Sequence, residues 1–124
     1  MMGATTYLYD VESQGGAFVY WPGSHTTTHD FFREFPEQID GSFRQREDWE
    51  PRQWGMFSDR SEVGPIEWIA AAGSVVFWHC FLCHTGSVNL RKVPRFGFFA
   101  RWHYDDREQM RYEVPQDLWK YWAV

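Results

Sequence analysis

A long apolar run in the second half of the chain reads Ser74-Val75-Val76-Phe77-Trp78-His79-Cys80-Phe81-Leu82-Cys83. It is rich in Val, Phe and Trp, and it follows Ala71-Ala72-Gly73, which has the composition of a turn. β-Branched and aromatic side chains favour strands, and glycine commonly separates one strand from the next. The run therefore predicts a buried strand up to Cys83, which gives way at His84 to a turn of small residues.

Shorter runs on both sides of this stretch predict further strands at residues 5–11, 17–21, 65–69 and 95–104. Residues 24–62 are irregular and polar, which predicts a long loop with one short helix at 30–35. The tail from Pro115 either begins a short helix or packs its aromatic rings back on the sheet. No repeat or linker interrupts the sequence, so we expect one mainly β domain over 1–124 with little helix.

The composition limits the classes of function. Hydrophobic residues make up 44% of the 124 residues and aromatic residues 20%, which is enough for a packed core. The net charge of −5 offers no basic surface for nucleic acid. The sequence has no apolar run long enough to span a bilayer and no signal-peptide pattern, so we expect a cytoplasmic protein that does not bind membranes. Its two cysteines, Cys80 and Cys83, are expected to stay reduced because residues three apart in a strand point to opposite faces.

Five histidines are candidates for chemistry, and most histidines in an apolar β run are structural. His84 is the exception, because a residue at the end of a rigid strand can project its imidazole into a cavity. The string from His79 to His84 contains two cysteines and two histidines, but a structural zinc site usually needs a second ligand pair further along the chain.

Three blocks of sequence are similar to the phytanoyl-CoA dioxygenase family of iron(II)- and 2-oxoglutarate-dependent oxygenases. The blocks are Gly16-Ala17-Phe18-Val19-Tyr20-Trp21-Pro22-Gly23-Ser24-His25, Gly73-Ser74-Val75-Val76-Phe77-Trp78-His79, and the segment from His84 through Asn89 to Arg95. The resemblance implies a double-stranded β-helix of the jelly-roll or cupin-like kind, of which this chain would form the C-terminal part.

By this resemblance, His84 corresponds to the distal iron-binding histidine, and Arg95, eleven residues later, binds the C5 carboxylate of 2-oxoglutarate. A guanidinium suits that role because it stays charged and can grip a carboxylate with two parallel hydrogen bonds. Arg91 and Arg101 match less well. Asn89 is expected to hold the connecting loop, and His25 and His79 are expected to support the site or the fold.

The family's other two iron ligands form a His-X-Asp pair that precedes the first block, where this sequence has almost no residues. The one such string, His103-Tyr104-Asp105, follows Arg95 and so has the wrong order. We therefore expect a fragment of an oxygenase that hydroxylates a small organic or lipid-like substrate, and we expect it to be inactive alone.

Two alternatives are left open. The chain could be a non-catalytic binding module that associates with itself or with a partner through exposed sheet edges. It could also be a cupin-type metal protein that uses His25, His29 and His84, with Asp30 as a fourth candidate ligand.

Overall fold

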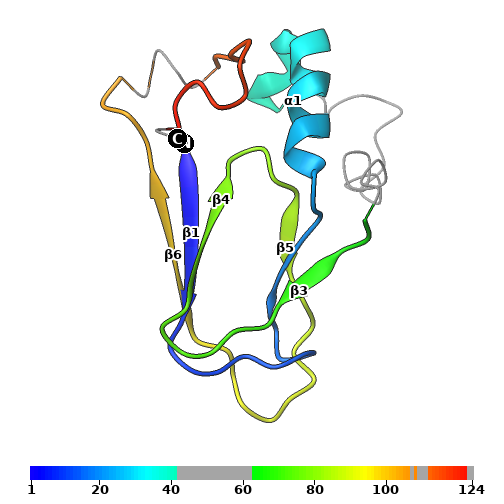
Figure 1. Cartoon of the computed structure of the whole chain (residues 1–124), viewed down its shortest axis with the longest axis vertical. Helices are drawn as coiled ribbons and strands as arrows, with labels where there is room; N and C mark the ends of the chain where they lie inside the picture. The colour runs from blue at the N-terminus through cyan, green and yellow to red at the C-terminus, as the bar shows by residue number, and fades with distance from the viewer. Residues whose placement is uncertain (42–62, 107, 109–111, 123–124) are drawn as a thin grey trace.

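The computed structural model describes residues 1–41, 63–106, 108 and 112–122. Its strands form two antiparallel sheets of three strands each (Figure 1). The first sheet has the order β4 (Val75–His79), β1 (Met2–Tyr7), β6 (Gly97–Trp102), and the second has the order β3 (Ile66–Trp68), β2 (Phe18–Tyr20), β5 (His84–Gly86). One α-helix, α1 (Ser24–Glu34), and a short 3₁₀ helix, η1 (Pro36–Asp40), complete the elements of the described residues. The prediction of a mainly β protein is confirmed.

The first sheet presents one face to the second sheet and the other to solvent. Directly opposed residues of antiparallel strands share a face, and Gly3 lies opposite Trp78. Trp78 is buried on the inner face, whereas Phe77, its neighbour in β4, is 58% exposed on the outer face. Gly3 allows this packing, because a Cβ on it would lie 2.3 Å from the Trp78 indole. The inner face therefore carries the core.

The hydroxyl of Tyr7 joins the two sheets. Tyr7 is the last residue of β1, and its side chain is fully buried. Its hydroxyl accepts a hydrogen bond of 2.6 Å from the backbone N–H of Phe18 in β2 and donates one of 3.2 Å to the carbonyl of Trp68 in β3. The Tyr7 and Trp68 rings also pack at 4.7 Å between centroids. One side chain of the first sheet thus satisfies two backbone groups of the second.

The helix is longer than the sequence indicates. We predict a short helix at 30–35, but α1 begins at Ser24 and ends at Glu34. The buried side chains of α1 lie on one face of the helix. Those in the first two turns, among them Ser24 and Thr28, are polar, so the sequence shows no apolar periodicity there. Tertiary contacts favour the helix there, since Ser24 Oγ accepts the backbone N–H of Cys83 at 2.9 Å. The rest of the predicted loop, 42–62, lies outside the described residues.

The apolar run at 74–83 is not one strand, which corrects the prediction. β4 ends at His79, a turn follows, and His84 begins β5 instead of following a strand. The turn forms because the backbone N–H of Leu82 donates to the carbonyl of His79 at 2.9 Å, and that of Phe81 donates to His79 Nδ1 at 3.1 Å. Cys80 is a free thiol that lies in this turn rather than in a strand, as does Cys83.

The remaining strands are close to their predicted places. β2 and β3 fall inside the predicted runs at 17–21 and 65–69, whereas β1 begins three residues before the predicted 5–11 and ends at Tyr7. β6 begins at Gly97, which leaves Arg95 in the preceding loop instead of in the predicted strand at 95–104. The tail forms turns from Pro115 onward and packs its rings, the second of the two outcomes that the sequence left open.

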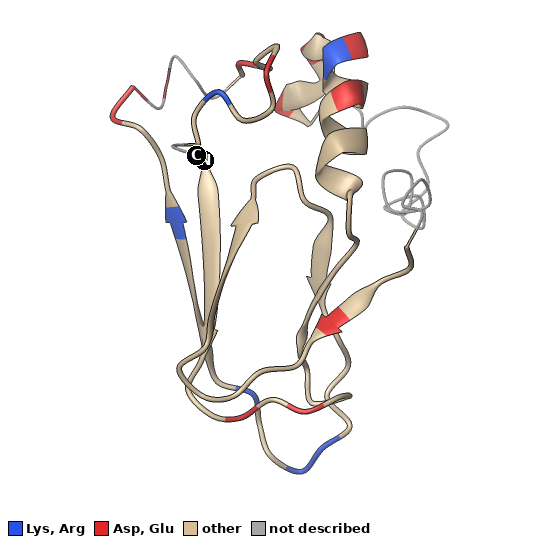
Figure 2. Ribbon diagram, in the orientation of Figure 1, with Lys and Arg blue, Asp and Glu red and all other residues tan. Residues whose placement is uncertain are grey.

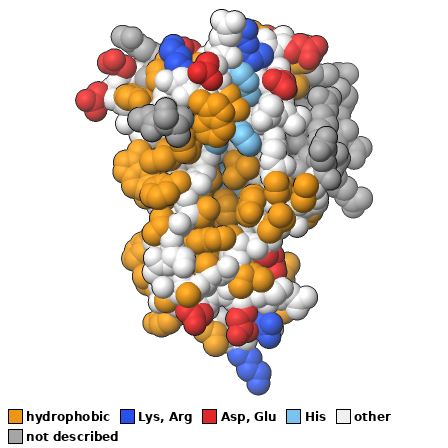
Figure 3. All heavy atoms as spheres, viewed as in Figure 1, with side chains coloured by type: hydrophobic (Ala, Val, Ile, Leu, Met, Phe, Trp, Pro, Cys, Tyr) orange, Lys and Arg blue, Asp and Glu red, His pale blue; other side chains and the backbone are white. Residues whose placement is uncertain are grey.

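Charged and apolar side chains separate along the long axis of the molecule. Among the described residues, Figure 2 shows acidic and basic residues mostly on the loops and on α1, with few on the strands. Figure 3 shows hydrophobic side chains over the middle of the molecule and charged ones near its two ends. No helix in the described part of the chain is long and apolar enough to cross a bilayer.

Replacing Tyr7 with Phe tests the link between the sheets. The change leaves the buried N–H of Phe18 without its hydrogen-bond acceptor, which should lower the free energy of unfolding by about 1–3 kcal/mol in urea denaturation. Tyr9→Phe is the matched control, because Tyr9 is 58% exposed and should tolerate the loss of its hydroxyl. Equal stability of the two variants would contradict a connecting role for Tyr7.

Candidate functional site

The imidazole of His84 is held between the two sheets. His84 begins β5 and lies opposite Tyr20, so it shares the inner face of its sheet with Phe18. Its ring is 4.3 Å from the Trp78 ring of the first sheet and 5.3 Å from the Phe18 ring of the second, measured between centroids. Two aromatic side chains on rigid strands therefore limit how far the imidazole can turn.

A backbone carbonyl selects the tautomer of His84. The Nδ1 atom lies 2.8 Å from the carbonyl oxygen of Leu82. A carbonyl only accepts, so Nδ1 must carry the proton, and the lone pair of the neutral ring is then on Nε2. Histidines that bind metals commonly donate their other ring N–H to a carbonyl in this way. The arrangement fits a metal ligand that binds through Nε2.

The side chain of Arg95 lies next to two glycines, and one of them, Gly86, is on the inner face of the second sheet. A Cβ on Gly86 would lie 4.0 Å from Arg95 Nη2, and a Cβ on Gly16 would lie 3.8 Å from Arg95 Nε. The guanidinium carbon also lies 5.4 Å from the centre of the Phe99 ring, which is on the inner face of β6. Small residues on one side and an aromatic ring on the other thus define the position of the Arg95 side chain.

The structure brings His84 and Arg95 into the same space between the sheets. His84 and Gly86 are two residues apart on β5, so they share a face and their Cα atoms are about 7 Å apart. Arg95, beside Gly86, therefore lies about one repeat of the strand from His84. Arg95 is also close enough to Tyr7 to act on its hydroxyl: burial raises the pKa of Tyr7, and the hydrogen bond from Phe18 and the charge of Arg95 oppose that rise.

Asn89 holds the connection between these residues, as predicted. Its side-chain Nδ2 donates to the carbonyl of Val93 at 3.0 Å, and its Oδ1 accepts the backbone N–H of Arg91 at 2.9 Å. The two weaker arginine candidates make other contacts. Arg91 donates to the carbonyl of Ser13, and Arg101 lies over the Trp78 ring at 5.9 Å.

The residues present supply only part of an iron site. Within the described ranges, no group of three His, Cys, Asp or Glu side chains is placed to hold a metal ion. His25 and His29 lie on α1, and the structure does not bring them together with His84 as the cupin-type alternative requires. His103 is exposed beyond the end of β6. His84 and its carbonyl partner fit one ligand position, but the described residues do not fit a complete two-histidine, one-carboxylate site.

Sequence reasoning missed the residues that shape the space around the pair. Gly16 and Gly86 lie against the Arg95 side chain, and the Leu82 carbonyl orients His84. A glycine in a strand is a weak sign of a close approach, so Gly86 carried a usable signal. The role of the Leu82 carbonyl could not be predicted from the sequence, because the direction of that carbonyl depends on the turn.

The fold and the His84–Arg95 pair define a two-sheet β protein with one imidazole and one guanidinium between its sheets. The family model for phytanoyl-CoA dioxygenase (PhyH) matches residues 1–97, which include both residues of the pair. The chain belongs to this family. No curated protein and no solved structure matched the chain in the other two comparisons.

A second group of histidines supports the structure instead of the site. His79 is buried, its Nδ1 accepts the N–H of Phe81, and its Nε2 donates to the carbonyl of Leu118 at 3.2 Å. Burial, together with smaller effects of His25, the Met1 amino group and His29, lowers the pKa of His79 to about 4, and the hydrogen bond to Leu118 opposes this shift. Burial also lowers the pKa of His25.

Because His79 and His25 have lowered pKa values, we expect the protein to lose stability in mild acid. Between pH 6.5 and about 4 the unfolded chain binds a proton at His79 that the folded chain does not, so the free energy of unfolding falls as the pH falls. His79→Gln should lessen this slope, by at most about 1.4 kcal/mol per pH unit, while His25 retains part of it. Urea denaturation at several pH values from 7 to 4 measures this slope of the free energy of unfolding against pH. The exposed His103→Gln is the control, and an unchanged slope in His79→Gln would contradict the assignment.

Proposed function

We propose that this chain provides the distal-histidine and cosubstrate-binding part of an iron(II)- and 2-oxoglutarate-dependent oxygenase of the phytanoyl-CoA dioxygenase family. The observation that carries the proposal is the pair itself: His84, with its lone pair on Nε2, and Arg95, about one strand repeat away in the same space between the sheets. The family match covers both residues. The double-stranded β-helix is part of this proposal.

In this proposal His84 binds iron(II) through Nε2. The ring needs little reorganisation on binding, because the Leu82 carbonyl and the Phe18 and Trp78 rings already set its tautomer and direction. When bound, iron supplies the activation of dioxygen, coupled to decarboxylation of 2-oxoglutarate to succinate. The aromatic walls around His84 limit the access of water to that position.

Arg95 binds the C5 carboxylate of 2-oxoglutarate. The described residues provide no ion pair to its guanidinium, so the fork of N–H donors is available for a carboxylate. The glycines at positions 16 and 86 leave the guanidinium accessible from the space between the sheets. The substrate to be hydroxylated is a small organic or lipid-like molecule.

A complete iron site needs two ligands besides His84, so we expect the chain alone not to form one. Anaerobic titration with iron(II) and 2-oxoglutarate should give no metal-to-ligand charge-transfer absorption. Joining a His-X-Asp segment of the family to the N-terminal side should produce the band, and His84→Ala in that extended chain should remove it. His103→Ala should keep the band. A band from the chain alone would contradict the incomplete site, and a band in the extended His84→Ala variant would contradict the role of His84.

Cosubstrate recognition by Arg95 can be tested without iron. Titration of the ¹⁵N-labelled chain with 2-oxoglutarate should shift the backbone amide signals of Gly16 and Gly86, which lie beside the guanidinium. Arg95→Ala should abolish these shifts. Arg95→Lys should restore them poorly, because an ammonium cannot form the two parallel hydrogen bonds of a guanidinium.

The control for this titration is Arg91→Ala, which removes an exposed arginine of the same loop. It should leave the shifts of Gly16 and Gly86 unchanged. Glutarate should compete with 2-oxoglutarate, since it presents the same distal carboxylate. Shifts that disappear in Arg91→Ala but persist in Arg95→Ala would overturn the assignment of the anchor.

A further inference from the structure

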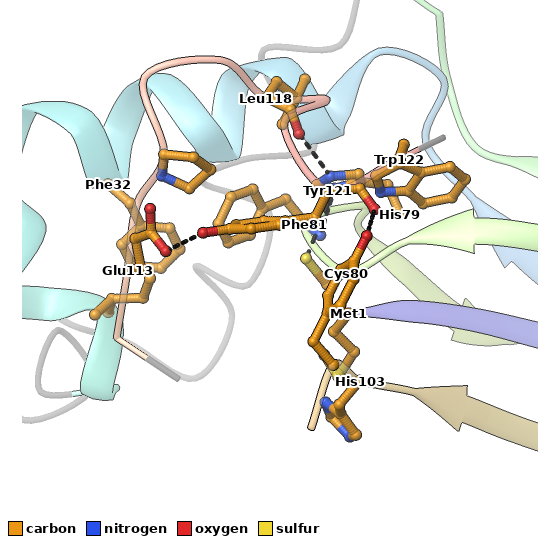
Figure 4. A pocket seen from close by; sticks show the side chains of 13 residues that line it. Met1, Phe32, His79, Cys80, Phe81, His103, Glu113, Leu118, Tyr121 and Trp122 are labelled. Atoms are coloured by element: carbon orange, nitrogen blue, oxygen red, sulfur yellow. Dashed lines mark hydrogen bonds between the residues drawn. The ribbon is translucent and has the colours of Figure 1, made fainter. Parts of the chain in front are cut away.

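A cavity of about 330 Å³ lies at the α1 end of the molecule. Its walls come from the end of β4 and the turn that follows, from α1 and η1, and from the C-terminal segment 113–122 (Figure 4). Phe32, Phe81, Leu118 and Trp122 provide much of its apolar surface, and the thiol of Cys80 faces it from the turn. Neither His84 nor Arg95 is among the residues that line it.

Hydrogen bonds from two buried imidazoles and one exposed phenol ring hold the walls in place. His29 Nε2 donates to the carbonyl of Pro115 at 2.7 Å, and His79 Nε2 donates to that of Leu118 at 3.2 Å. The hydroxyl of Tyr104 donates to the carbonyl of Tyr121 at 3.1 Å. Three separate parts of the fold thus fasten the C-terminal segment, so the cavity exists before any ligand binds and a ligand does not have to order its walls.

Most of the side chains that line the cavity are apolar, uncharged or paired. Glu113 is balanced by Lys120, whose Nζ lies 2.6 Å from it, and by the hydroxyl of Tyr121, and these hydrogen bonds lower the pKa of the carboxyl. Burial raises the pKa of the Cys80 thiol and lowers that of His79 to about 4. Both ring nitrogens of His79 are already used in hydrogen bonds. The side chains of the walls therefore offer mainly apolar contact, and the cation beside them is the backbone amino group of Met1, whose charge acts on His79 and Cys80.

We propose that this cavity binds an uncharged, flat aromatic molecule of about two fused rings, at a site separate from the iron and cosubstrate positions. A dry apolar cavity of about 150 Å³ accommodates benzene, so one of about twice that volume suits a two-ring compound. The rings of Phe32, Phe81 and Trp122 give such a molecule aromatic partners on several sides. Cavities of this volume stand at the small end of those that bind small ligands in proteins.

The two cysteines provide an internal test with 2-naphthol as the probe. Cys80 lines the cavity, whereas Cys83 lies three residues later, does not line it, and contacts Thr28 Oγ1 at 3.8 Å. In the Cys83→Ser variant, 2-naphthol should slow alkylation of Cys80 by N-ethylmaleimide. At ten times the Kd, mass action leaves about one site in eleven empty, so we expect the rate to fall roughly tenfold. In Cys80→Ser, alkylation of Cys83 should not change.

Filling the cavity provides a second test. Leu118→Trp places a larger side chain in the lining and should abolish the protection of Cys80, whereas Leu90→Trp, at a position 69% exposed, should not. When the Met1 amino group is acetylated, 2-naphthoate should bind at least about tenfold more weakly than 2-naphthol, because the cavity would have to desolvate its charge with no ammonium beside it. Equal protection by the two compounds would contradict an uncharged ligand.

Chemical-shift mapping of 2-naphthol on the unmodified chain keeps the proposal testable if Leu118→Trp does not fold. The signals of Phe81, Tyr121 and the Trp122 indole should shift and saturate together. Shifts concentrated instead on the exposed apolar face of β4 and β6, around Phe77 and Phe98, would overturn the proposal by showing nonspecific adsorption. Equal slowing of both cysteines by 2-naphthol would overturn it as well.

Discussion

The buried hydroxyl of Tyr7 is the constraint on which the arrangement of the two sheets depends. A hydroxyl can accept and donate a hydrogen bond at the same time, and this one accepts the N–H of Phe18 and donates to the carbonyl of Trp68. Burial raises the pKa of Tyr7, which keeps the proton that the second bond requires. The two sheets are thereby held at the separation that the Trp78 and Phe18 rings fill.

The His84–Arg95 pair depends on that separation. His84 contacts Trp78 from the first sheet and Phe18 from the second, so a change in sheet spacing would release its ring. Arg95 enters the same space from a loop, and its side chain lies against Gly16 and Gly86. The charge of a guanidinium is costly to bury without a partner, and a dicarboxylate cosubstrate would supply that partner. One rigid ligand and one anion anchor are what the described residues contribute to the proposed oxygenase site.

Three of the other histidines support the C-terminal segment instead of the pair. His29 and His79 use ring N–H groups to fasten the C-terminal segment to α1 and β4, and His25 packs against His79 and Trp119. Because His79 is buried and already hydrogen-bonded through both nitrogens, it forms part of a wall and not a ligand set. The His84–Arg95 pair thus lies between the sheets, whereas a mainly apolar cavity lies beside α1 and the C-terminal segment.

The sequence by itself determined the mainly β class and the approximate places of β2 and β3, which follow from local composition. The His84–Arg95 pair, with Asn89 in the loop between them, is a prediction from the resemblance to the family, and its spacing does not depend on small errors in strand bounds. The start of α1 at Ser24, the end of β4 at His79 and the position of Arg95 before β6 were decided only by the tertiary structure. These bounds depend on turns or on contacts between residues far apart in the chain. An example is the hydrogen bond from the N–H of Cys83 to the hydroxyl of Ser24. A periodicity of apolar residues records which side chains are buried, but it does not record which backbone groups satisfy one another across the fold.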